Sequence, residues 1–373
     1  MTKHILNLPT LAGRIRMVDE FLVQLLASRH RLSLQVSASK RAGGEPVFRS
    51  EIERERIDAA AEYGAKLGLN PDFVRAIMYV VIGESCKDQI IERETYVGSP
   101  SNLLPYDEQK ANLLALTKAI AKSYDVTYHS SHATRLYAAF EAAQLESLVF
   151  DMAHRDRFVD LGCGTGTVAL GAGYKFESVV GYDLSPDMLE VARAKHAEKH
   201  ANTNVAFVEA DLENGIPEKD ASVSFVAMTL GTASDLLNIG KVISEIRRVL
   251  KPGGRFMFSF YNSAALLYQW QYLPWQFSLA AHMNHDDHCL EVEHDGRAYQ
   301  IYAHPYTTDE VGKMFEWATS KKTVTYPTIA AIMPNETFIG QPDDRLTRTM
   351  SELDTQLSFG HYGAYIIVSG EKS

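Results

Sequence analysis

The segment 158–166 constrains the fold of this chain more than any other stretch of its sequence. It begins with the apolar residues of a buried strand, contains Asp160, and ends in glycines at alternate positions, Gly162, Gly164 and Gly166. Glycines directly after a strand let the backbone approach a ligand where a Cβ atom would collide with it. A second expected strand, 178–182, ends in Asp183, an acid suited to hydrogen bonding with ribose hydroxyls. We therefore expect a parallel strand–helix–strand unit with a nucleoside-like ligand at its loop.

The glycine spacing distinguishes two kinds of nucleotide site. A nicotinamide or flavin dinucleotide site has the spacing G-x-G-x-x-G, whereas here the third glycine comes one residue earlier. Asp160 also stands two residues before the first glycine, where a carboxylate repels a pyrophosphate but suits a cationic amino-acid ligand. The resulting D-x-G-x-G-x-G pattern resembles the first motif of class I S-adenosylmethionine (SAM) methyltransferases. The resemblance implies SAM as the cofactor.

Three later segments follow in the order of the same family. Leu184 and Met188, which follow Asp183, resemble the family's adenine-facing wall. Segment 209–212 resembles the segment whose acid meets the adenine amino group. Segment 250–255 resembles the turn before the family's fifth strand. In similar enzymes an aromatic residue ahead of the first strand closes over the methionine part of SAM. The cofactor set that the resemblance implies is Tyr124, Tyr128, Asp160, Gly162, Gly164, Gly166, Asp183, Leu184, Met188, Asp211, Leu212 and Thr229.

Charge and apolar patterning favour a cytoplasmic enzyme that acts on a small molecule. The net charge of −10, without a clustered basic stripe, disfavours nucleic acid as a partner. The sequence has no run of about 18 apolar residues and no signal-peptide core, so no membrane partner is expected. The cysteines are too scattered for a disulfide framework or a zinc site. The histidines from His282 to His288 lack a known ligand spacing, so no metal is expected there.

Residues 10–43 show a long helical pattern that two cations interrupt. Apolar residues recur at alternating spacings of three and four from Leu11 to Val36. A helix of that length spans roughly 50 Å at about 1.5 Å per residue, and a small domain cannot cover such a stripe by itself. We therefore expect a homodimer through the N-terminal helices. Arg29 and Lys40 fall on the stripe, so an anion is expected beside them unless both side chains reach solvent at the helix edge.

Two shorter helices are expected next, one from Ser50 to Gly68 and one from Pro71 to Glu92. This three-helix order over residues 11–92 resembles the all-helical chorismate mutase family. In that family two intertwined chains enclose chorismate, a dianion that rearranges to prephenate. The mutase-like site that the resemblance implies consists of Arg29, Lys40, Arg54, Glu55, Ser85 and Gln89.

The resemblance also implies roles for these side chains. Arg29 would bind a carboxylate, and Lys40 and Gln89 would hydrogen-bond to the breaking ether oxygen. Glu55 would bind the ring hydroxyl, and Arg54 and Ser85 would support these contacts. One position departs from the family, because Ala12 stands where the partner chain usually donates a further arginine. The loss of such a contact commonly costs about 2 kcal/mol. A weak mutase, a site for another anion and a dimerisation unit therefore all remain open.

The expected domains are an all-α chorismate mutase-like domain at 1–95, a linker with a lid helix at 96–123, and the methyltransferase domain at 124–373. Alternating strands and helices predict the α/β class, with a Rossmann-like doubly wound parallel sheet and its ligand at the carboxyl ends of the strands. The insertion 262–304 is rich in aromatic residues between Tyr268 and Phe277. We expect it to form a helical cap over the acceptor pocket, with plain core or an oligomer contact as the alternative.

The leading hypothesis is a SAM-dependent methyltransferase that acts on a small molecule of specialised metabolism. Tyr128 and Tyr261 are its candidate catalytic residues. No sequence feature chooses a general base, for which His129 and the histidines near His285 are candidates. The fused mutase-like unit suggests an acceptor related to chorismate, prephenate or phenylpyruvate, with carbon or oxygen as the methylated atom.

Three alternatives to methyl transfer stay open. A carboxy-SAM synthase would combine SAM with prephenate. An azetidine-forming SAM cyclase would let the amine of SAM attack its own chain and release methylthioadenosine. A SAM- or metabolite-sensing dimer would bind without turnover. The nucleoside product distinguishes these alternatives from methyl transfer, which releases S-adenosylhomocysteine.

Overall fold

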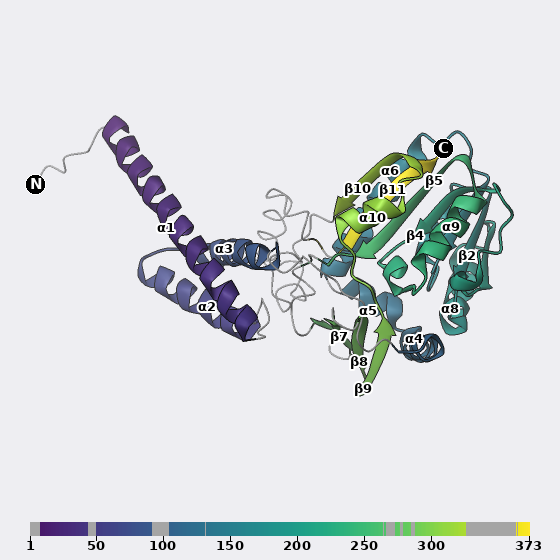
Figure 1. Ribbon diagram of the computed structural model, residues 1–373, viewed down its shortest axis with the longest axis horizontal. Helices are drawn as coiled ribbons and strands as arrows, with labels where there is room; N and C mark the ends of the chain where they lie inside the picture. Colours follow the sequence, from purple (N-terminus) through teal and green to yellow (C-terminus); the bar gives the residue numbers. More distant parts are fainter. Residues whose placement is uncertain are drawn as a thin grey trace, which may run out of the picture. The chain divides into compact units, whose positions relative to one another are not determined.

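The computed structural model describes residues 8–43, 50–91, 104–130, 132–263, 265, 273–276, 279–284, 288–325, 363 and 365–373. The chain divides into two compact units, Met1–Thr95 and Tyr96–Ser373. In its described residues the first unit is helical and the second is built around a β-sheet (Figure 1). None of the helices in these ranges has the length and apolar character that a membrane span needs.

The first unit contains the three helices that the sequence predicts. They are α1 (Leu8–Ala42), α2 (Ser50–Lys66) and α3 (Pro71–Ile91). Helix α2 packs against α3, and α3 also packs against α1. The buried positions on α2 and α3 recur every three or four residues, because one face of each helix turns inward. This small core consists of Ile57, Ala61, Ala76, Tyr79, Ile82 and Cys86.

Helix α1 buries only its second half. Ser33, Ser37 and Lys40 are buried within the unit, whereas the side chains of the first half are exposed. The exposed residues include most of the predicted apolar stripe: Leu11, Ile15, Val18, Leu22 and Leu25. Within the described chain, the first half of α1 thus presents apolar side chains to solvent.

The second unit is built on a seven-stranded sheet in the order β10-β11-β5-β4-β1-β2-β3. Strands β1 to β5 are parallel to their neighbours in that group, and β11 runs antiparallel to both β5 and β10. The strands are β1 (Arg157–Leu161), β2 (Ser178–Asp183), β3 (Val205–Glu209), β4 (Val223–Met228), β5 (Leu250–Tyr261), β10 (Ala318–Thr325) and β11 (Tyr365–Lys372). The predicted doubly wound α/β sheet is therefore confirmed.

Strand β1 marks the point where the strand order reverses, because it pairs with β2 on one side and β4 on the other. Ligands of doubly wound sheets bind at the carboxyl ends of the strands at such a point. The helices of this unit that accompany the sheet are α6 (His132–Phe150), α7 (Thr167–Ala172), α8 (Pro186–Lys199), α9 (Ile239–Val249) and α10 (Thr308–Met314).

The sheet core is apolar and rich in aromatic rings. Strands β1 and β4 are buried almost throughout, as expected of parallel strands that are covered on both faces. The ring of Phe158 stacks on Phe225 at 5.3 Å between centroids, and Phe256 stacks on Phe315 at 5.0 Å. This packing gives the loops at the strand ends a rigid base.

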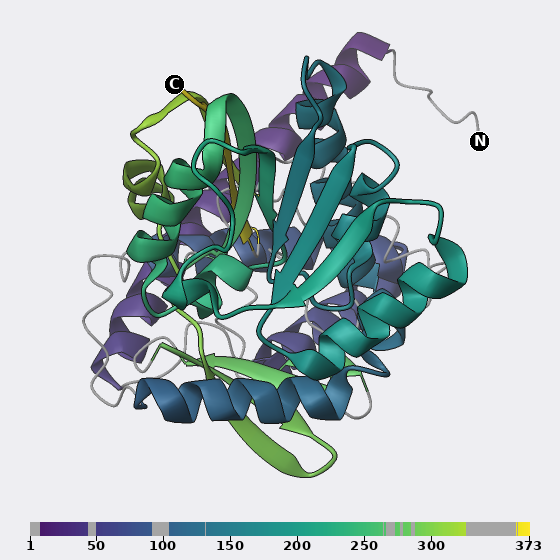
Figure 2. The same cartoon turned by 90° about the vertical axis from the view of Figure 1, so that its right-hand side faces the viewer.

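The cap insertion differs from its prediction. Its described residues form a four-stranded antiparallel sheet, not a helical cap, with strands β6 (Leu273–Gln276), β7 (Leu279–Asn284), β8 (Cys289–His294) and β9 (Arg297–Tyr302). Asp295 and Gly296, both at positive φ, join β8 to β9, and an Asp-Gly pair is a strong hairpin signal. Helix α4 (Tyr106–Ile120) packs against β9 (Figure 2). Of the predicted cap aromatics, Tyr268, Trp270, Tyr272 and Phe277 lie outside the described residues, as does the side chain of Trp275.

Candidate functional site

The three glycines of the loop after β1 have left-handed backbone conformations. Gly162, Gly164 and Gly166 have φ values of 67°, 51° and 81°. A Cβ at Gly162 would overlap the side chain of Thr232, and one at Gly166 would lie 2.6 Å from the ring of Phe207. A Cβ at Gly164 would meet no atom within 4 Å. The outer two glycines therefore permit close packing, and the middle one lies open toward the cavity.

Asp183, at the end of β2, accepts one backbone hydrogen bond from the glycine loop and one from the turn that follows β2. Its carboxylate accepts one from the Gly164 amide at 2.7 Å and one from the Ser185 amide at 2.8 Å, each on a different oxygen. Burial raises the pKa of this carboxyl above its usual range, although hydrogen bonds from Ser185, Gly164 and Leu184 oppose the rise. Because an ionised carboxylate has about four lone-pair sites, Asp183 can still accept a hydrogen bond from a ligand hydroxyl.

Asp160 lies beneath the loop, on β1. It is buried and accepts a hydrogen bond from the Ala169 amide at 3.0 Å. Burial raises the pKa of its carboxyl to about 8, with the hydrogen bond from Ala169 opposing and Asp183 adding to the rise. A cation bound nearby would favour its ionised form.

Asp211 is held by the helix that covers this edge of the sheet. Its Oδ2 atom accepts hydrogen bonds from the Tyr106 hydroxyl at 2.8 Å and the Lys110 ammonium at 2.9 Å, both on α4. Its Oδ1 atom accepts one from the Glu213 amide at 3.1 Å. The acid predicted to meet the adenine amino group thus also ties α4 to the end of β3.

Four tyrosines gather beside the loop. Tyr124 and Tyr128 on α5 (Tyr124–Ser130) stack at 5.9 Å between centroids. Tyr261, at the end of β5, lies 5.7 Å from Tyr365 on β11. Burial raises the pKa of Tyr128 and of Tyr261 well above the usual range. These phenols therefore stay neutral near pH 7 and can donate or accept hydrogen bonds, but they are poor bases.

Helix α5 is attached to the glycine loop by Asp125. The Thr165 hydroxyl donates to one of its carboxylate oxygens at 2.6 Å, and the Lys195 ammonium of α8 donates to the other at 2.8 Å. This bridge fixes the position of Tyr124, the preceding residue. Neither bond was predicted, because the partners are far apart in the sequence.

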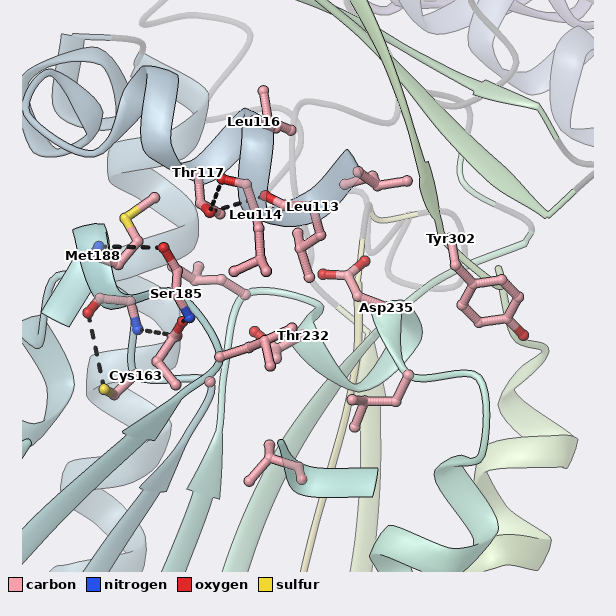
Figure 3. Close-up of a pocket in the computed structure, with 18 of the residues that line it drawn as sticks. Leu113, Leu114, Leu116, Thr117, Cys163, Ser185, Met188, Thr232, Asp235 and Tyr302 are labelled. Atoms are coloured by element: carbon pink, nitrogen blue, oxygen red, sulfur yellow. Dashed lines mark hydrogen bonds between the residues drawn. The ribbon is translucent and has the colours of Figure 1, made fainter. Parts of the chain in front are cut away.

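The glycine loop, the ends of β2 and β3 and the four tyrosines border one cavity of about 350 Å³, a size typical of small-molecule sites (Figure 3). Eleven residues of the predicted cofactor set line it, as does Tyr261; Gly166, which packs on Phe207, does not. Helix α4 and strands β8 and β9 complete the wall with the apolar side chains of Leu113, Leu114, Leu116, Leu290, Val292 and Ile301. The predicted cofactor residues that line the cavity are Tyr124, Tyr128, Asp160, Gly162, Gly164, Asp183, Leu184, Met188, Asp211, Leu212 and Thr229.

Two acids beside the cavity were missed in the sequence. Glu141 of α6 is buried and accepts a hydrogen bond from the Leu230 amide at 3.0 Å. Asp235 lies at the end of the short helix η2 (Thr232–Asp235), and the Tyr261 hydroxyl hydrogen-bonds to it. The signal for Asp235 was its place just after β4, at the edge of the sheet where ligands bind.

The first unit brings several predicted mutase-site residues together. The Arg29 guanidinium of α1 donates to the Val81 carbonyl at 3.0 Å and to the Ser85 hydroxyl, both on α3. The Gln89 amide donates to the Ser33 hydroxyl at 3.1 Å. Burial, and then the neighbouring Arg56, lower the pKa of Arg29. Lys40 is buried on the same helix.

Helix α2 presents a different acid from the predicted one. Glu55 is exposed and Arg54 is half-buried, whereas Glu53 is 5% exposed and accepts a hydrogen bond from Arg56 at 2.8 Å. Glu53 shares the inward face with Ile57, four residues later. The helical period thus brings Glu53, not Glu55, next to the Arg29 cluster, and Ala12 is exposed.

The structure describes only some of the histidines that are candidate general bases or metal ligands. The side chains of His129 and His282, and the whole of His285, lie outside the described residues. His288 is buried, and its Nδ1 atom lies 2.8 Å from that of His304. In the part of the chain that is described, no three histidine, cysteine or acidic side chains cluster closely enough to hold a metal ion.

Part of each unit matches a known protein family. Residues 158–254 match the family described as a methyltransferase domain, and residues 11–90 match chorismate mutase type II. A ubiquinone/menaquinone biosynthesis C-methyltransferase UbiE from Methylobacterium nodulans is 28% identical over 157 residues, which are 41% of this chain and 61% of the relative. A demethylmenaquinone methyltransferase from Symbiobacterium thermophilum is 35% identical over 106 residues, which are 27% of this chain and 41% of the relative. The chain thus spans less than two thirds of the length of these relatives.

Two solved structures are also similar. The protein PH0226 from Pyrococcus horikoshii aligns with 64% of this chain and 91% of its own, at 19% identity and a TM-score of 0.43. A phosphoethanolamine N-methyltransferase from Haemonchus contortus, in complex with SAM, aligns with 62% of this chain and 51% of its own, at 18% identity and a TM-score of 0.40.

The residues of the cavity fit SAM. Gly164 leaves room for the ligand at the loop, and Asp183 offers free lone pairs to the ribose hydroxyls. The buried Asp160 carboxyl supplies a potential negative charge for the amino-acid end of a cationic ligand. Leu184 and Met188 line the cavity beside Asp183, where an adenine ring needs an apolar surface.

We expect Asp183→Ala to reduce the affinity for S-adenosylhomocysteine at least about tenfold, because two charge-assisted hydrogen bonds to the ribose are lost. Isothermal titration calorimetry measures the change. Asp187→Ala, which removes a nearby acid from the first turn of α8, is the matched control and should keep the affinity within about twofold. Equal affinity of wild type and Asp183→Ala would contradict the ribose assignment.

Proposed function

We propose that this chain, which carries a class I SAM-dependent methyltransferase domain over residues 158–254 and a type II chorismate mutase domain over residues 11–90, transfers the methyl group of SAM to a small molecule. One observation carries the proposal: a single cavity joins the glycine loop and Asp183 to an apolar chamber under α4 and β9. The first part suits the nucleoside, and the second leaves room for an acceptor.

When bound, SAM supplies an electrophilic methyl group, so the protein has to align the acceptor and exclude water. Asp183 and the glycine loop would hold the sugar. Tyr124, Tyr128 and Tyr261 would surround the methionine end and orient it with neutral hydroxyl groups, since their burial disfavours phenolates. Tyr128 and Tyr261 thus act by positioning in this proposal, not as bases.

The fused mutase unit supports an acceptor from the chorismate series. A cytoplasmic enzyme of specialised metabolism is the setting that such a fusion favours. The cavity size and its apolar wall support a small acceptor. The tyrosine cluster would also allow the methionine chain to fold for cyclisation, so the nucleoside product has to be identified.

The product of SAM turnover tests this function directly. The protein is incubated with SAM and a panel of chorismate, prephenate, phenylpyruvate and neutral aromatic acceptors, and the nucleosides are separated by mass spectrometry. We expect S-adenosylhomocysteine together with an acceptor heavier by one methylene. Methylthioadenosine would instead indicate a cyclase, and carboxy-SAM would indicate a synthase. Tight SAM binding with no product from the panel would favour the sensing dimer.

The first unit would bind the dianion of a chorismate-like ligand. Arg29, Lys40 and Arg56 supply cations around α1 and α2, and Glu53 supplies an acceptor for a ligand hydroxyl. Ser85 and Gln89 line the same side of α3. Because Ala12 donates no charge, we expect binding that is weaker by about 2 kcal/mol than with an arginine there.

We expect Glu53→Gln to lower the rate of prephenate formation from chorismate roughly 10- to 100-fold, because a charge-assisted hydrogen bond to the ring hydroxyl weakens. Glu55→Gln, two residues away on the exposed face, is the matched control and should leave the rate unchanged. The loss of chorismate absorbance measures both. A larger effect of Glu55→Gln would restore the assignment made from sequence.

A homodimer through α1 is the assembly that these observations support. The exposed apolar side chains from Leu11 to Leu25 would be covered by a second copy. We expect light scattering to give the mass of two chains for the wild type. Leu22→Glu should shift the protein toward one chain, because it places a charge in the apolar contact, whereas Glu20→Gln should not. A wild-type monomer at micromolar concentration would contradict this assembly.

A further inference from the structure

The cavity of the second unit has an acidic side chain that the cofactor assignment does not use. Asp235 lies on η2, across the cavity from the leucines of α4, and its carboxyl group points into the cavity (Figure 3). Its Oδ1 atom is buried and accepts no hydrogen bond from the described residues. The Tyr261 hydroxyl hydrogen-bonds to the carboxylate. One oxygen of Asp235 is thus oriented by the protein, and the other is left for a ligand.

The backbone around Asp235 is anchored. The hydroxyl of the preceding residue, Ser234, accepts a hydrogen bond from the Tyr261 amide at 2.8 Å, and the Ser234 carbonyl accepts one from the His304 amide at 2.8 Å. Ser234 is fully buried. These bonds join η2 to β5 and to the segment after β9. They therefore hold in place the backbone from which the Asp235 side chain extends.

Within the described part of the chain, the titratable groups that face Asp235 are uncharged near neutral pH. They are tyrosines from four elements, Tyr124 of α5, Tyr261 of β5, Tyr302 of β9 and Tyr365 of β11. No cation is among them. Burial raises the pKa of the Asp235 carboxyl to about 8, with the Tyr261 hydrogen bond opposing the rise. A carboxyl group in this range can take up a proton near neutral pH.

The charge of the cavity wall restricts the acceptor. In the described lining the acids are Asp160, Asp183, Asp211, Glu213 and Asp235. Lys110 is the one lysine or arginine in that lining, and it is bound to Asp211; His294 is the one histidine. An anionic acceptor would meet carboxyl groups and an apolar wall without an available guanidinium or ammonium. A chorismate-derived acceptor would therefore have to be a neutral derivative and not one of the acids.

We propose that Asp235 is the general base of the methyl transfer and that the acceptor is an uncharged phenol whose ring lies against the apolar wall formed by α4, β8 and β9. This inference rests on the proposed methyltransferase function. The phenol oxygen forms the new bond to the methyl carbon, and the electrons of the broken carbon–sulfur bond return to sulfur. The phenol proton moves to the free oxygen of Asp235, while Tyr261 orients the carboxylate. The protonated carboxyl group then releases its proton to solvent.

The first test needs no turnover. Because the folded chain holds the Asp235 proton up to about pH 8, whereas an unfolded chain releases it near 3.8, this group lowers the free energy of unfolding as pH rises through that window. We expect the melting temperature of Asp235→Asn, relative to wild type, to rise between pH 5 and pH 8 and to level off above it. Asp309→Asn, which alters an exposed acid of α10, is the control and should show no such trend. Parallel profiles of Asp235→Asn and wild type would overturn the inference.

The second test compares 4-ethylphenol with 4-hydroxyphenylacetate, a phenol of similar size that carries a carboxylate. We expect wild type to methylate the neutral phenol at least tenfold faster. Asp235→Asn should lower kcat at least about 100-fold, with KM and S-adenosylhomocysteine affinity changed less than about threefold, and should remove the rise of kcat toward pH 8. Asp309→Asn should behave as wild type.

The outcomes separate the two levels of the proposal. Methyl transfer that is unchanged in Asp235→Asn, or a preference for 4-hydroxyphenylacetate, would overturn the role of Asp235 or the neutral acceptor while leaving the methyltransferase function in place. Binding of S-adenosylhomocysteine without methyl transfer to either phenol or to any acceptor of the wider panel would overturn both.

Discussion

The two hydrogen bonds from the Gly164 and Ser185 amides to Asp183 are the contacts on which the second unit depends for its ligand site. The bond from Gly164 joins the loop after β1 to the end of β2, the bond from Ser185 fixes the turn that follows β2, and the parallel register of the two strands brings these segments together. In the proposed function the same carboxylate would also bind the ribose. One side chain would then serve both the loop structure and ligand binding, and Gly164, where a Cβ would meet no atom within 4 Å, leaves the space beside it open.

The cavity collects carboxyl groups that differ in their surroundings. Asp211 is paired with Lys110, whereas Asp160 lies near the acids Asp183 and Glu141, and Asp235 lies among tyrosines. Burial raises the pKa of Asp160 and of Asp235 to about 8. A sulfonium ligand beside Asp160 would favour its ionised form, and a phenol beside Asp235 would use its basicity. The difference between these acids arises from their neighbours, because the side chains are chemically identical.

Local sequence signals predicted some parts of this protein well and others poorly. The D-x-G-x-G-x-G pattern predicted the loop and the family, because the glycine spacing is local to one turn of the chain. The cap insertion was predicted to be helical, but Asp295-Gly296 is a hairpin signal, and the described residues around it form antiparallel strands. In the first unit, Glu55 was chosen by resemblance to a motif, whereas the helical phase set by Ile57 turns Glu53 inward.

The sequence by itself determined that one unit is helical and the other is α/β, and it determined the parallel sheet and the SAM fingerprint. These signals are apolar periodicity and glycine spacing, which act over short distances. Only the tertiary structure decided that Asp235 and Tyr261 meet, that Lys110 ties α4 to Asp211, and that β8 and β9 form the wall opposite the glycine loop. These contacts join segments that are distant along the chain. Their formation depends on the packing of the whole sheet, which no local pattern encodes.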